Sequence, residues 1–290
     1  MRPITTRFAP SPTGALHLGH AFAALTAWRA AKEASGRFLV RIEDIDSTRC
    51  RPEFEAAIFE DLTWLGLDWP IPVRRQSEHL DAYARALDSL RGRDLIYPCF
   101  CTRAEIKAEI ARAGAAPHLA TEGADPVYPG TCRRLSEPER AARIARGDPF
   151  ALRLNLTAAL EETGPLIWHD ATRGTVVAEA RRFGDVVLAR KEMPTSYHLA
   201  VTLDDHLQGV TLVTRGEDLF EATHIQRVLQ ALLGLDVPNY AHHRLITDED
   251  GRRFAKRDRA VTLAALRERG VTPAEVMAAF KAGAVARLPG

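Results

Sequence analysis

The sequence predicts an α/β protein whose parallel sheet is interrupted by a long insertion. Three observations predict this class. Strand and helix patterns alternate over residues 2–64, which is typical of a parallel α/β sheet. From residue 97 to about residue 183 the chain becomes irregular and rich in proline and glycine. Strand and helix patterns then return from residue 184, so we expect one sheet built in two halves.

The first half of the predicted sheet contains two strands, each followed by a helix. Residues 2–9 form a short strand pattern that ends at Pro10, and residues 21–34 read as an apolar helix. Residues 37–46 read as a second strand, buried at first and ending in several carboxylates. A helix then begins at Pro52, because proline suits the first turn of a helix.

The rest of the chain follows in three parts. The insertion contains two basic helix patterns, at residues 103–113 and 136–146, and the second half contains an amphipathic helix from Ala222 to Leu233. Two short helices close the chain as a C-terminal extension. The first half of the α/β domain is predicted at residues 1–98 and the insertion at residues 99–183. The second half is predicted at residues 184–258 and the extension at residues 259–290.

Composition places the chain among ordinary globular proteins. It has 290 residues, of which 46% are hydrophobic and 27% charged, so we expect a packed core and not disorder. The formal net charge of +1 argues against a polycation that wraps nucleic acid, although a local basic face remains open. No apolar run reaches the length of a membrane span and no signal-peptide core is present, so we expect a cytoplasmic protein without a membrane partner.

The stretch RFAPSPTGALHLGH, at residues 7–20, is the first candidate site. Gly14 and Gly19 allow a close approach of the backbone, and His17 and His20 share one face if the turn is helical. A helix N-terminus suits a polyphosphate, and imidazoles there can donate to phosphate oxygens as charge develops. We therefore expect both histidines to be catalytic and, with Gly19, to bind ATP. The alternative is a capped helix with incidental histidines.

The second candidate site is the stretch GRRFAKRD, at residues 251–258. A lysine in a glycine-containing turn can reach across a site and neutralise a leaving pyrophosphate, so Lys256 is a candidate catalytic and ATP-binding residue. Taken alone, the stretch also reads as a solvated basic loop.

Together these two stretches resemble the two signatures of class I aminoacyl-tRNA synthetases. HLGH is similar to the HIGH signature, and the second stretch stands where those enzymes carry KMSKS. The KMSKS-like residues are Arg253, Phe254, Ala255, Lys256 and Arg257. Lys256 keeps the second lysine of the signature, whereas Arg253 replaces the first lysine and Ala255 replaces the serine. We therefore expect activation with weaker ATP contacts.

Four stretches resemble the glutamyl branch of that class: RFAPSPTGALHLGHA, RIEDIDSTR, SYHLAVTLDD and TRGEDL. This resemblance implies a Rossmann-like parallel sheet with an acceptor-side insertion. The short length resembles truncated paralogues without an anticodon-binding domain, which attach glutamate to the queuosine base of tRNA(Asp). The resemblance thus implies L-glutamate, ATP and queuosine-bearing tRNA(Asp) as partners, and we expect a monomer.

A glutamate site is also supported by the residue types. Two carboxylates and one ammonium require two cationic clamps and one anion. Arg7 and Arg215, each expected just past a predicted strand, can bind the carboxylates, and Glu43 can bind the ammonium. Surface ion pairs are the alternative. The candidate glutamate-binding residues are Arg7, Phe8, Ala9, Pro10, Ser11, Glu43, Tyr197 and Arg215. Asp44 and Asp46 are expected to brace the turn.

The cysteines of the insertion suggest a metal site. Cys99 and Cys101 cannot complete a tetrahedral zinc site alone, and the residues between 102 and 135 offer several further ligands. These are His118, Glu122, Tyr128 and Cys132. The truncated paralogues combine C-x-C with Y-x-x-x-C, so the resemblance implies a structural zinc held by Cys99, Cys101, Tyr128 and Cys132. His118 remains the rival for Tyr128, and three metal-free thiols remain the alternative.

The leading hypothesis implied by the resemblance is activation of L-glutamate to glutamyl-adenylate without tRNA, with Mg²⁺ arriving on ATP. Three alternatives remain open. They are a catalytic fragment of glutamyl-tRNA synthetase that charges a tRNA 3′ end, a small-molecule nucleotidyltransferase, and an inactive RNA-binding paralogue.

Overall fold

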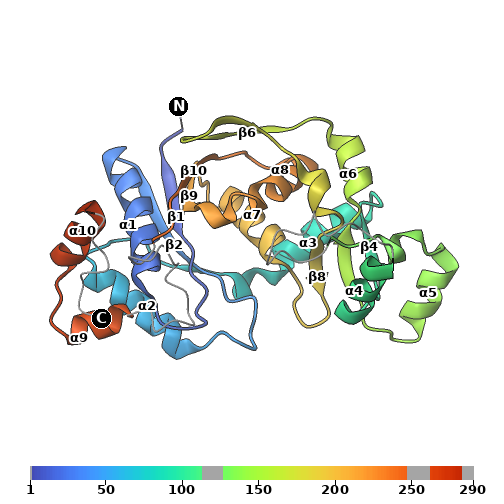
Figure 1. Cartoon of the computed structure of the whole chain (residues 1–290), viewed down its shortest axis with the longest axis horizontal. Helices are drawn as coiled ribbons and strands as arrows, with labels where there is room; N and C mark the ends of the chain where they lie inside the picture. The colour runs from blue at the N-terminus through green and yellow to red at the C-terminus, as the bar shows by residue number, and fades with distance from the viewer. Residues whose placement is uncertain (1, 113–126, 247–261, 283–290) are drawn as a thin grey trace.

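The computed structural model describes residues 2–112, 127–246 and 262–282. In Figure 1, helices α1, α2, α9 and α10 lie at one end of the long axis, and strand β4 with helices α4 and α5 lies at the other. The helices are α1 (Leu18–Glu33), α2 (Pro52–Trp64), α3 (Leu80–Arg91), α4 (Arg103–Arg112), α5 (Glu137–Ala145), α6 (Leu156–Thr163), α7 (Tyr197–Leu207), α8 (Ala222–Leu232), α9 (Leu263–Glu268) and α10 (Pro273–Ala282).

The central feature is the parallel sheet that the sequence predicts. Its strands are β1 (Thr5–Phe8), β2 (Arg37–Ile42), β3 (Arg74–Arg75), β9 (Leu212–Gly216) and β10 (Asn239–His243). Strand β2 pairs in parallel with β1 and β3, and β9 pairs in parallel with β10. The amide of Thr211, just before β9, donates to the carbonyl of Thr5 at 2.9 Å and so joins the two halves. Chain order therefore reverses between β1 and β9, where α/β sheets form their ligand crevice.

Two of the predicted boundaries in the first half are wrong by several residues. Strand β2 ends at Ile42 and not at residue 46, because the carboxylates that follow it accept hydrogen bonds in a turn. Asp44 accepts from the amide and hydroxyl of Ser77, and Asp46 accepts from Thr48 and Arg49, so both brace the turn as predicted. Helix α1 begins at Leu18 and not at residue 21, because the preceding histidine caps it.

The insertion folds around a separate antiparallel sheet, in which β5 (Ala151–Leu154) lies between β4 (Ile96–Cys99) and β8 (Val187–Arg190). Both predicted basic helices are confirmed as α4 and α5. A hairpin of β6 (Ile167–Asp170) and β7 (Gly174–Val177) leaves this sheet, and β6 pairs with β10. Asp170 is thereby placed at the edge of the parallel sheet.

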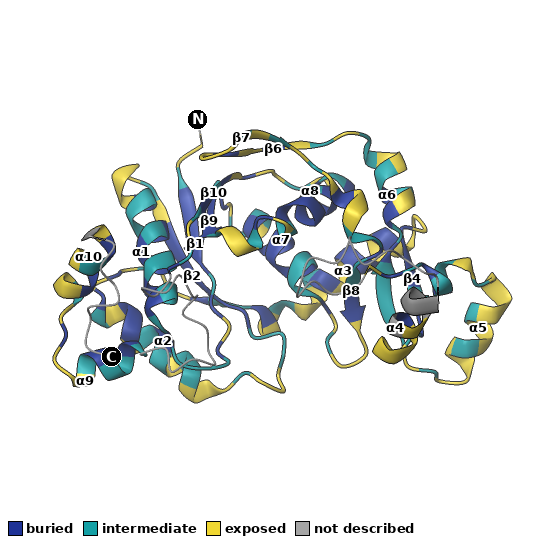
Figure 2. Ribbon diagram, viewed as in Figure 1, coloured by how far each residue is buried: buried dark blue, intermediate teal, exposed yellow. Residues whose placement is uncertain are grey.

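Two large hydrophobic cores support this arrangement. One joins β1 and β2 to α1, α2, α9 and α10, and the other joins α3, α7 and α8 to the insertion. Figure 2 shows the buried residues concentrated on the parallel strands and on α7 and α8, whereas α5 is mostly exposed. Within the part of the chain that the structure describes, no helix combines the length and apolar character that crossing a membrane requires.

Candidate functional site

The HLGH turn holds its two histidines against each other at the start of α1. His17 is the N-cap, and its Nδ1 accepts from the amide of Gly19 at 3.1 Å. His20 Nδ1 accepts from the amide of His17 at 3.2 Å, and the ring centroids lie 3.8 Å apart. A Cβ at Gly19 would lie 3.0 Å from His17 Cε1, so glycine makes room for this ring. With both Nδ1 atoms accepting, each neutral imidazole carries its proton on Nε2, the tautomer that can donate to phosphate.

The segment that follows residues 247–261 packs at this histidine turn, and the segment before them enters the same hydrophobic core. After them, Thr262 forms an isolated antiparallel bridge with His17, and the amide of Leu263 donates to the carbonyl of Leu16 at 2.9 Å. Before them, Ile246 is buried in the same core cluster as Leu16. Lys256 and the other KMSKS-like residues lie outside the described residues. Of the described segments on either side of them, the one that begins at Thr262 contacts the histidine turn.

Arg7 belongs to a buried network with Arg41, Asp205 and Glu43, and Arg41 Nε also lies 3.8 Å from Asp204 Oδ2. Its Nε donates to Asp205 Oδ1 at 3.0 Å, and Arg41 Nη1 donates to the same oxygen at 2.8 Å. Arg41 Nη2 also donates to Glu43 Oε1 at 3.1 Å. Burial raises the pKa of Glu43 in spite of Arg41. Burial would also raise the pKa of Asp205, but Arg7 and Arg41 hold it below its ordinary value. The predicted ammonium ligand Glu43 is thus already ion-paired.

Sequence reasoning missed Arg41 and Asp205, although both lie inside the stretches that carry the family resemblance. A signal was present for Arg41, since it stands at the otherwise apolar end of the strand RFLVRI. A fully buried arginine needs a paired carboxylate, and here that partner comes from α7. No local pattern identifies Asp205 as that partner.

Arg215 is held by a second network that ends at Asp170. Its Nε donates to His242 Nε2 at 3.0 Å, and its Nη2 donates to the hydroxyl of Thr223 at 2.6 Å. His242 Nδ1 lies 2.7 Å from Asp170 Oδ2. Burial and Arg215 lower the pKa of His242 to about 4, so the neutral ring donates from Nδ1 to Asp170 and accepts from Arg215 at Nε2. Arg215 Nη1 donates to the hydroxyl of Tyr197 at 3.3 Å.

The structure brings most of the predicted glutamate-site residues to the reversal point of the sheet. Arg7 Nη1 donates to the carbonyl of Thr214 at 3.3 Å, so the two predicted clamps stand on neighbouring strands. The hydroxyl of Ser11 donates to the carbonyl of Glu43 at 2.7 Å, and the amide of Glu43 donates to the carbonyl of Pro10 at 3.0 Å. Phe8 is buried and Ala9 is half-buried beside them. Asp170, Thr223 and His242 are the residues that sequence reasoning missed here; the His-His pair at 242–243 was their only visible signal.

The three insertion cysteines form one cluster. The sulfur atoms of Cys99, Cys101 and Cys132 all lie within 4.8 Å of one another. The Tyr128 hydroxyl lies 3.6 Å from Cys101 Sγ and accepts from the amide of Cys132 at 2.8 Å. Gly130 makes this possible, because its φ of +80° turns the chain back toward Tyr128. His118 and Glu122 lie outside the described residues.

The electrostatics of the cluster favour a thiolate at Cys132. A hydrogen bond from Cys99, together with one from Tyr128 and one from the Phe100 amide, lowers the pKa of the Cys132 thiol to about 6. The Arg153 guanidinium lies 4.0 Å from the centroid of the Tyr128 ring. Three sulfur donors with one phenol oxygen beside them match the number and type of ligands that a tetrahedral thiophilic metal takes.

Comparison with known proteins gives consistent results. The family model for the catalytic domain of class I tRNA synthetases (E and Q) matches residues 3–284. A glutamyl-Q tRNA(Asp) synthetase of Rhodobacter capsulatus is 51% identical over 276 residues, covering 93% of this chain and 97% of the relative. A glutamyl-Q tRNA(Asp) synthetase of Symbiobacterium thermophilum is 44% identical over 280 residues, covering 93% of this chain and 83% of the relative.

A solved structure agrees with the sequence relatives. The crystal structure of a glutamate tRNA ligase from Elizabethkingia meningosepticum in complex with its amino acid superimposes with a TM-score of 0.73 at 30% identity. The match covers 89% of this chain and 52% of that one. The chain therefore belongs to the class I tRNA synthetases of the E and Q type, within them to the family of glutamyl-Q tRNA(Asp) synthetases, and is a ligase.

Proposed function

We propose that the protein activates L-glutamate with ATP to glutamyl-adenylate without tRNA, and then transfers glutamate to the queuosine base of tRNA(Asp). The observation that carries the first step is the placement of two buried arginines, Arg7 and Arg215, on neighbouring strands at the reversal point of the sheet. Support for the second step comes from relatives whose names specify that RNA. We propose that both steps take place in the cytoplasm.

In the proposed first step, a glutamate carboxylate oxygen attacks the α-phosphorus of ATP in line, and the bond to the β-phosphate breaks. Arg7 and Arg215 bind the two carboxylates, while Glu43, Ser11 and Tyr197 bind or orient the amino acid. The peptide from Phe8 to Pro10 forms a wall of this site. Catalysis then rests on positioning and on electrostatic stabilisation.

The other proposed site residues bind the phosphates of ATP. His17 and His20 donate from Nε2 to the phosphate oxygens, and Gly19 lets the helix N-terminus approach them. Lys256 holds the leaving pyrophosphate, and Mg²⁺ arrives with ATP. In the second step an RNA hydroxyl attacks the activated carbonyl carbon, and AMP leaves. We place the RNA on the insertion, residues 99–183. In this division the insertion joins the two halves of the α/β domain, residues 1–98 and 184–258, and residues 259–290 form the extension.

The test of this function separates activation from transfer. We expect ATP–pyrophosphate exchange that requires glutamate and proceeds without tRNA, and an absence of exchange under these conditions would contradict the proposal. Labelled glutamate is then offered to tRNA(Asp) with and without queuosine, each with and without its 3′ CCA. We expect labelling to require queuosine and to ignore CCA. The reverse pattern would instead identify an enzyme that charges the tRNA 3′ end.

We further propose that Cys99, Cys101, Tyr128 and Cys132 hold one structural zinc. The zinc would fix the start of the insertion, since its ligands tie the end of β4 to the turn at residues 128–132. We expect about one zinc per chain by elemental analysis, and a Cys132→Ser variant to lose most of it because a hydroxyl is a poor zinc ligand at neutral pH. Tyr128→Phe is expected to weaken zinc retention against a chelator, and His118→Ala to leave it unchanged. The opposite result for these two variants would assign the fourth ligand to His118.

A further inference from the structure

A cavity outside the candidate active site lies where the insertion joins the α/β domain. Its volume is about 460 Å³, which is within the range of small-ligand pockets. Helix α3, the loop after α5, strand β5 and strand β8 with the loop after it all contribute to its wall. Such junctions between two structural units are common places for binding sites.

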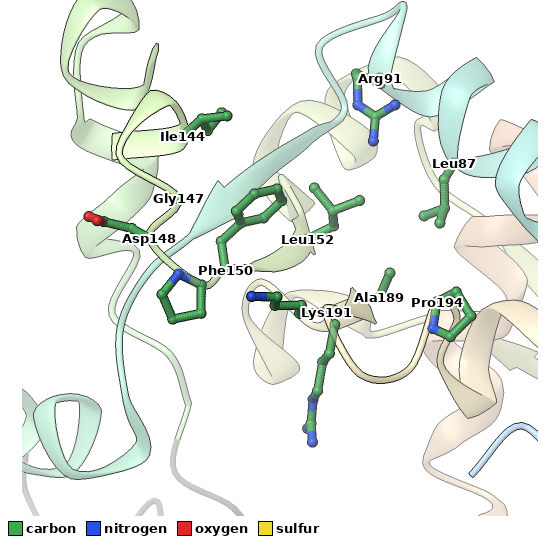
Figure 3. A pocket seen from close by; sticks show the side chains of 12 residues that line it. Leu87, Arg91, Ile144, Gly147, Asp148, Phe150, Leu152, Ala189, Lys191 and Pro194 are labelled. Atoms are coloured by element: carbon green, nitrogen blue, oxygen red, sulfur yellow. The ribbon is translucent and has the colours of Figure 1, made fainter. Parts of the chain in front are cut away.

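The floor of this cavity is apolar and contains one aromatic ring. Figure 3 shows Phe150 on one side of the cavity, Leu87 and Pro194 on the other, and Leu152 between them. Phe150 is half-buried and is held edge-on against Phe100, with ring centroids 5.7 Å apart. A fixed, partly exposed ring in an apolar pocket suits a planar, apolar-faced group.

The rim of the cavity is positively charged. Arg91, Arg190 and Lys191 line it and are exposed, and Arg91 forms an ion pair with Asp88. Asp148 is the one carboxylate of the lining, but it accepts from Arg143 at 2.9 Å and Arg146 at 3.1 Å, and Figure 3 shows it directed away from the cavity. Among the described residues, no carboxylate pairs with Arg190 or Lys191. The rim thus offers an unneutralised positive charge to an anionic ligand.

The cavity is linked directly to the glutamate site by the chain. Pro194 in its wall stands three residues before Tyr197, whose hydroxyl accepts from Arg215. The intervening Ser196 caps helix α7 through the amide of Leu199, so the connection is short and ordered. A ligand in the cavity therefore lies on the insertion side of the amino-acid site, where we place the RNA.

A planar apolar face surrounded by cations matches an unpaired nucleotide, which stacks its base on an aromatic ring and places its phosphate on basic side chains. We propose that this cavity binds one unpaired nucleotide of the RNA substrate, with its base against Phe150 and its phosphate at Arg190 and Lys191. The proposal rests on the proposed function for the identity of the RNA. No residue of the cavity belongs to the proposed activation site.

The experiment measures two quantities on the same variants. The first is binding of queuosine-bearing tRNA(Asp), as a Kd at several salt concentrations, and the second is glutamate-dependent ATP–pyrophosphate exchange without tRNA. We expect Arg190→Glu/Lys191→Glu to raise the Kd at least tenfold and to reduce the slope of log Kd against log salt by about 1 to 2, because phosphate contacts are lost. Exchange is expected to stay within twofold of the unaltered protein.

Controls separate the cavity from general charge and folding effects. Arg37→Glu reverses one positive charge at the amino end of β2, which is half the charge change of the double variant, and is expected to raise the Kd less than threefold. Phe150→Leu is expected to weaken tRNA binding several-fold, because stacking needs an aromatic ring. Phe150→Tyr keeps an aromatic ring and is expected to bind tRNA as the unaltered protein does. Unchanged binding in the double variant, or no measurable binding of tRNA by the unaltered protein, would overturn the inference. An absence of ATP–pyrophosphate exchange in the unaltered protein would instead overturn the proposed activation chemistry.

Discussion

Replacing Lys256 with alanine is expected to reduce glutamate-dependent ATP–pyrophosphate exchange by about 10²–10³-fold, the cost of removing one group that stabilises developing charge in a transition state. The ammonium of Lys256 is assigned to the pyrophosphate that leaves in the first step. The loss should therefore appear in kcat, while KM for glutamate changes little, because the arginine clamps Arg7 and Arg215 are intact. Steady-state exchange at saturating ATP measures both constants.

The described neighbours of that lysine are the reason to expect so large an effect. Thr262 bridges His17, and Leu263 donates to Leu16, so the chain returns to the histidine turn directly after residues 247–261. Lys281→Ala in α10 is the matched control, since this lysine is exposed in the extension and has no assigned role. Near-normal exchange in Lys256→Ala would remove the lysine from the mechanism and leave the histidines as the sole phosphate ligands assigned.

The order of elements could be predicted from the sequence because each strand and helix carries its own periodic pattern. The helices expected at residues 103–113 and 136–146 are present, and the parallel sheet resumes after the insertion. The two clamp arginines, Arg7 and Arg215, are expected from the sequence just past a strand, and the structure places each within the last residues of one, in β1 and β9. Their convergence followed from a general property of parallel α/β sheets, in which ligand sites form where the chain order reverses.

The partners of those arginines could not be predicted in this way. Arg7 pairs with Asp205 across 198 residues of chain, and Arg215 reaches Asp170 through His242. In a linear sequence a buried aspartate looks the same as a solvated one, because its environment is created only by the tertiary fold. Asp170 is the clearest case, since its strand β6 lies in the insertion but pairs with β10 of the parallel sheet.

Replacing Asp205 with alanine is expected to lower the free energy of unfolding at pH 7 by about 3–5 kcal/mol, the usual cost of breaking a buried ion pair from one side. One oxygen of this carboxylate receives both Arg7 at 3.0 Å and Arg41 at 2.8 Å, and all three side chains are buried. Removing it leaves Arg7 without its paired carboxylate and leaves Arg41 with Glu43 and the more distant Asp204. Urea unfolding compares this variant with Asp236→Ala, which breaks an exposed pair with Arg2 and should change stability little.

The stability difference between the unaltered protein and Asp205→Ala should depend on pH, and the pKa of Asp205 fixes the sign of this dependence. Arg7 and Arg41 hold that pKa below its ordinary value, so the folded state binds fewer protons here than the unfolded state does. The contribution of Asp205 is therefore complete above the unfolded pKa, near 4, and is lost as the pH falls through the lower folded value. We expect the stability gap between the unaltered protein and Asp205→Ala to be constant from pH 7 to 5 and to narrow below about pH 4. A gap that widened with acid would mean that Asp205 is protonated in the folded protein, and Arg7 would then lack the anion that holds it in the position assigned to a glutamate clamp.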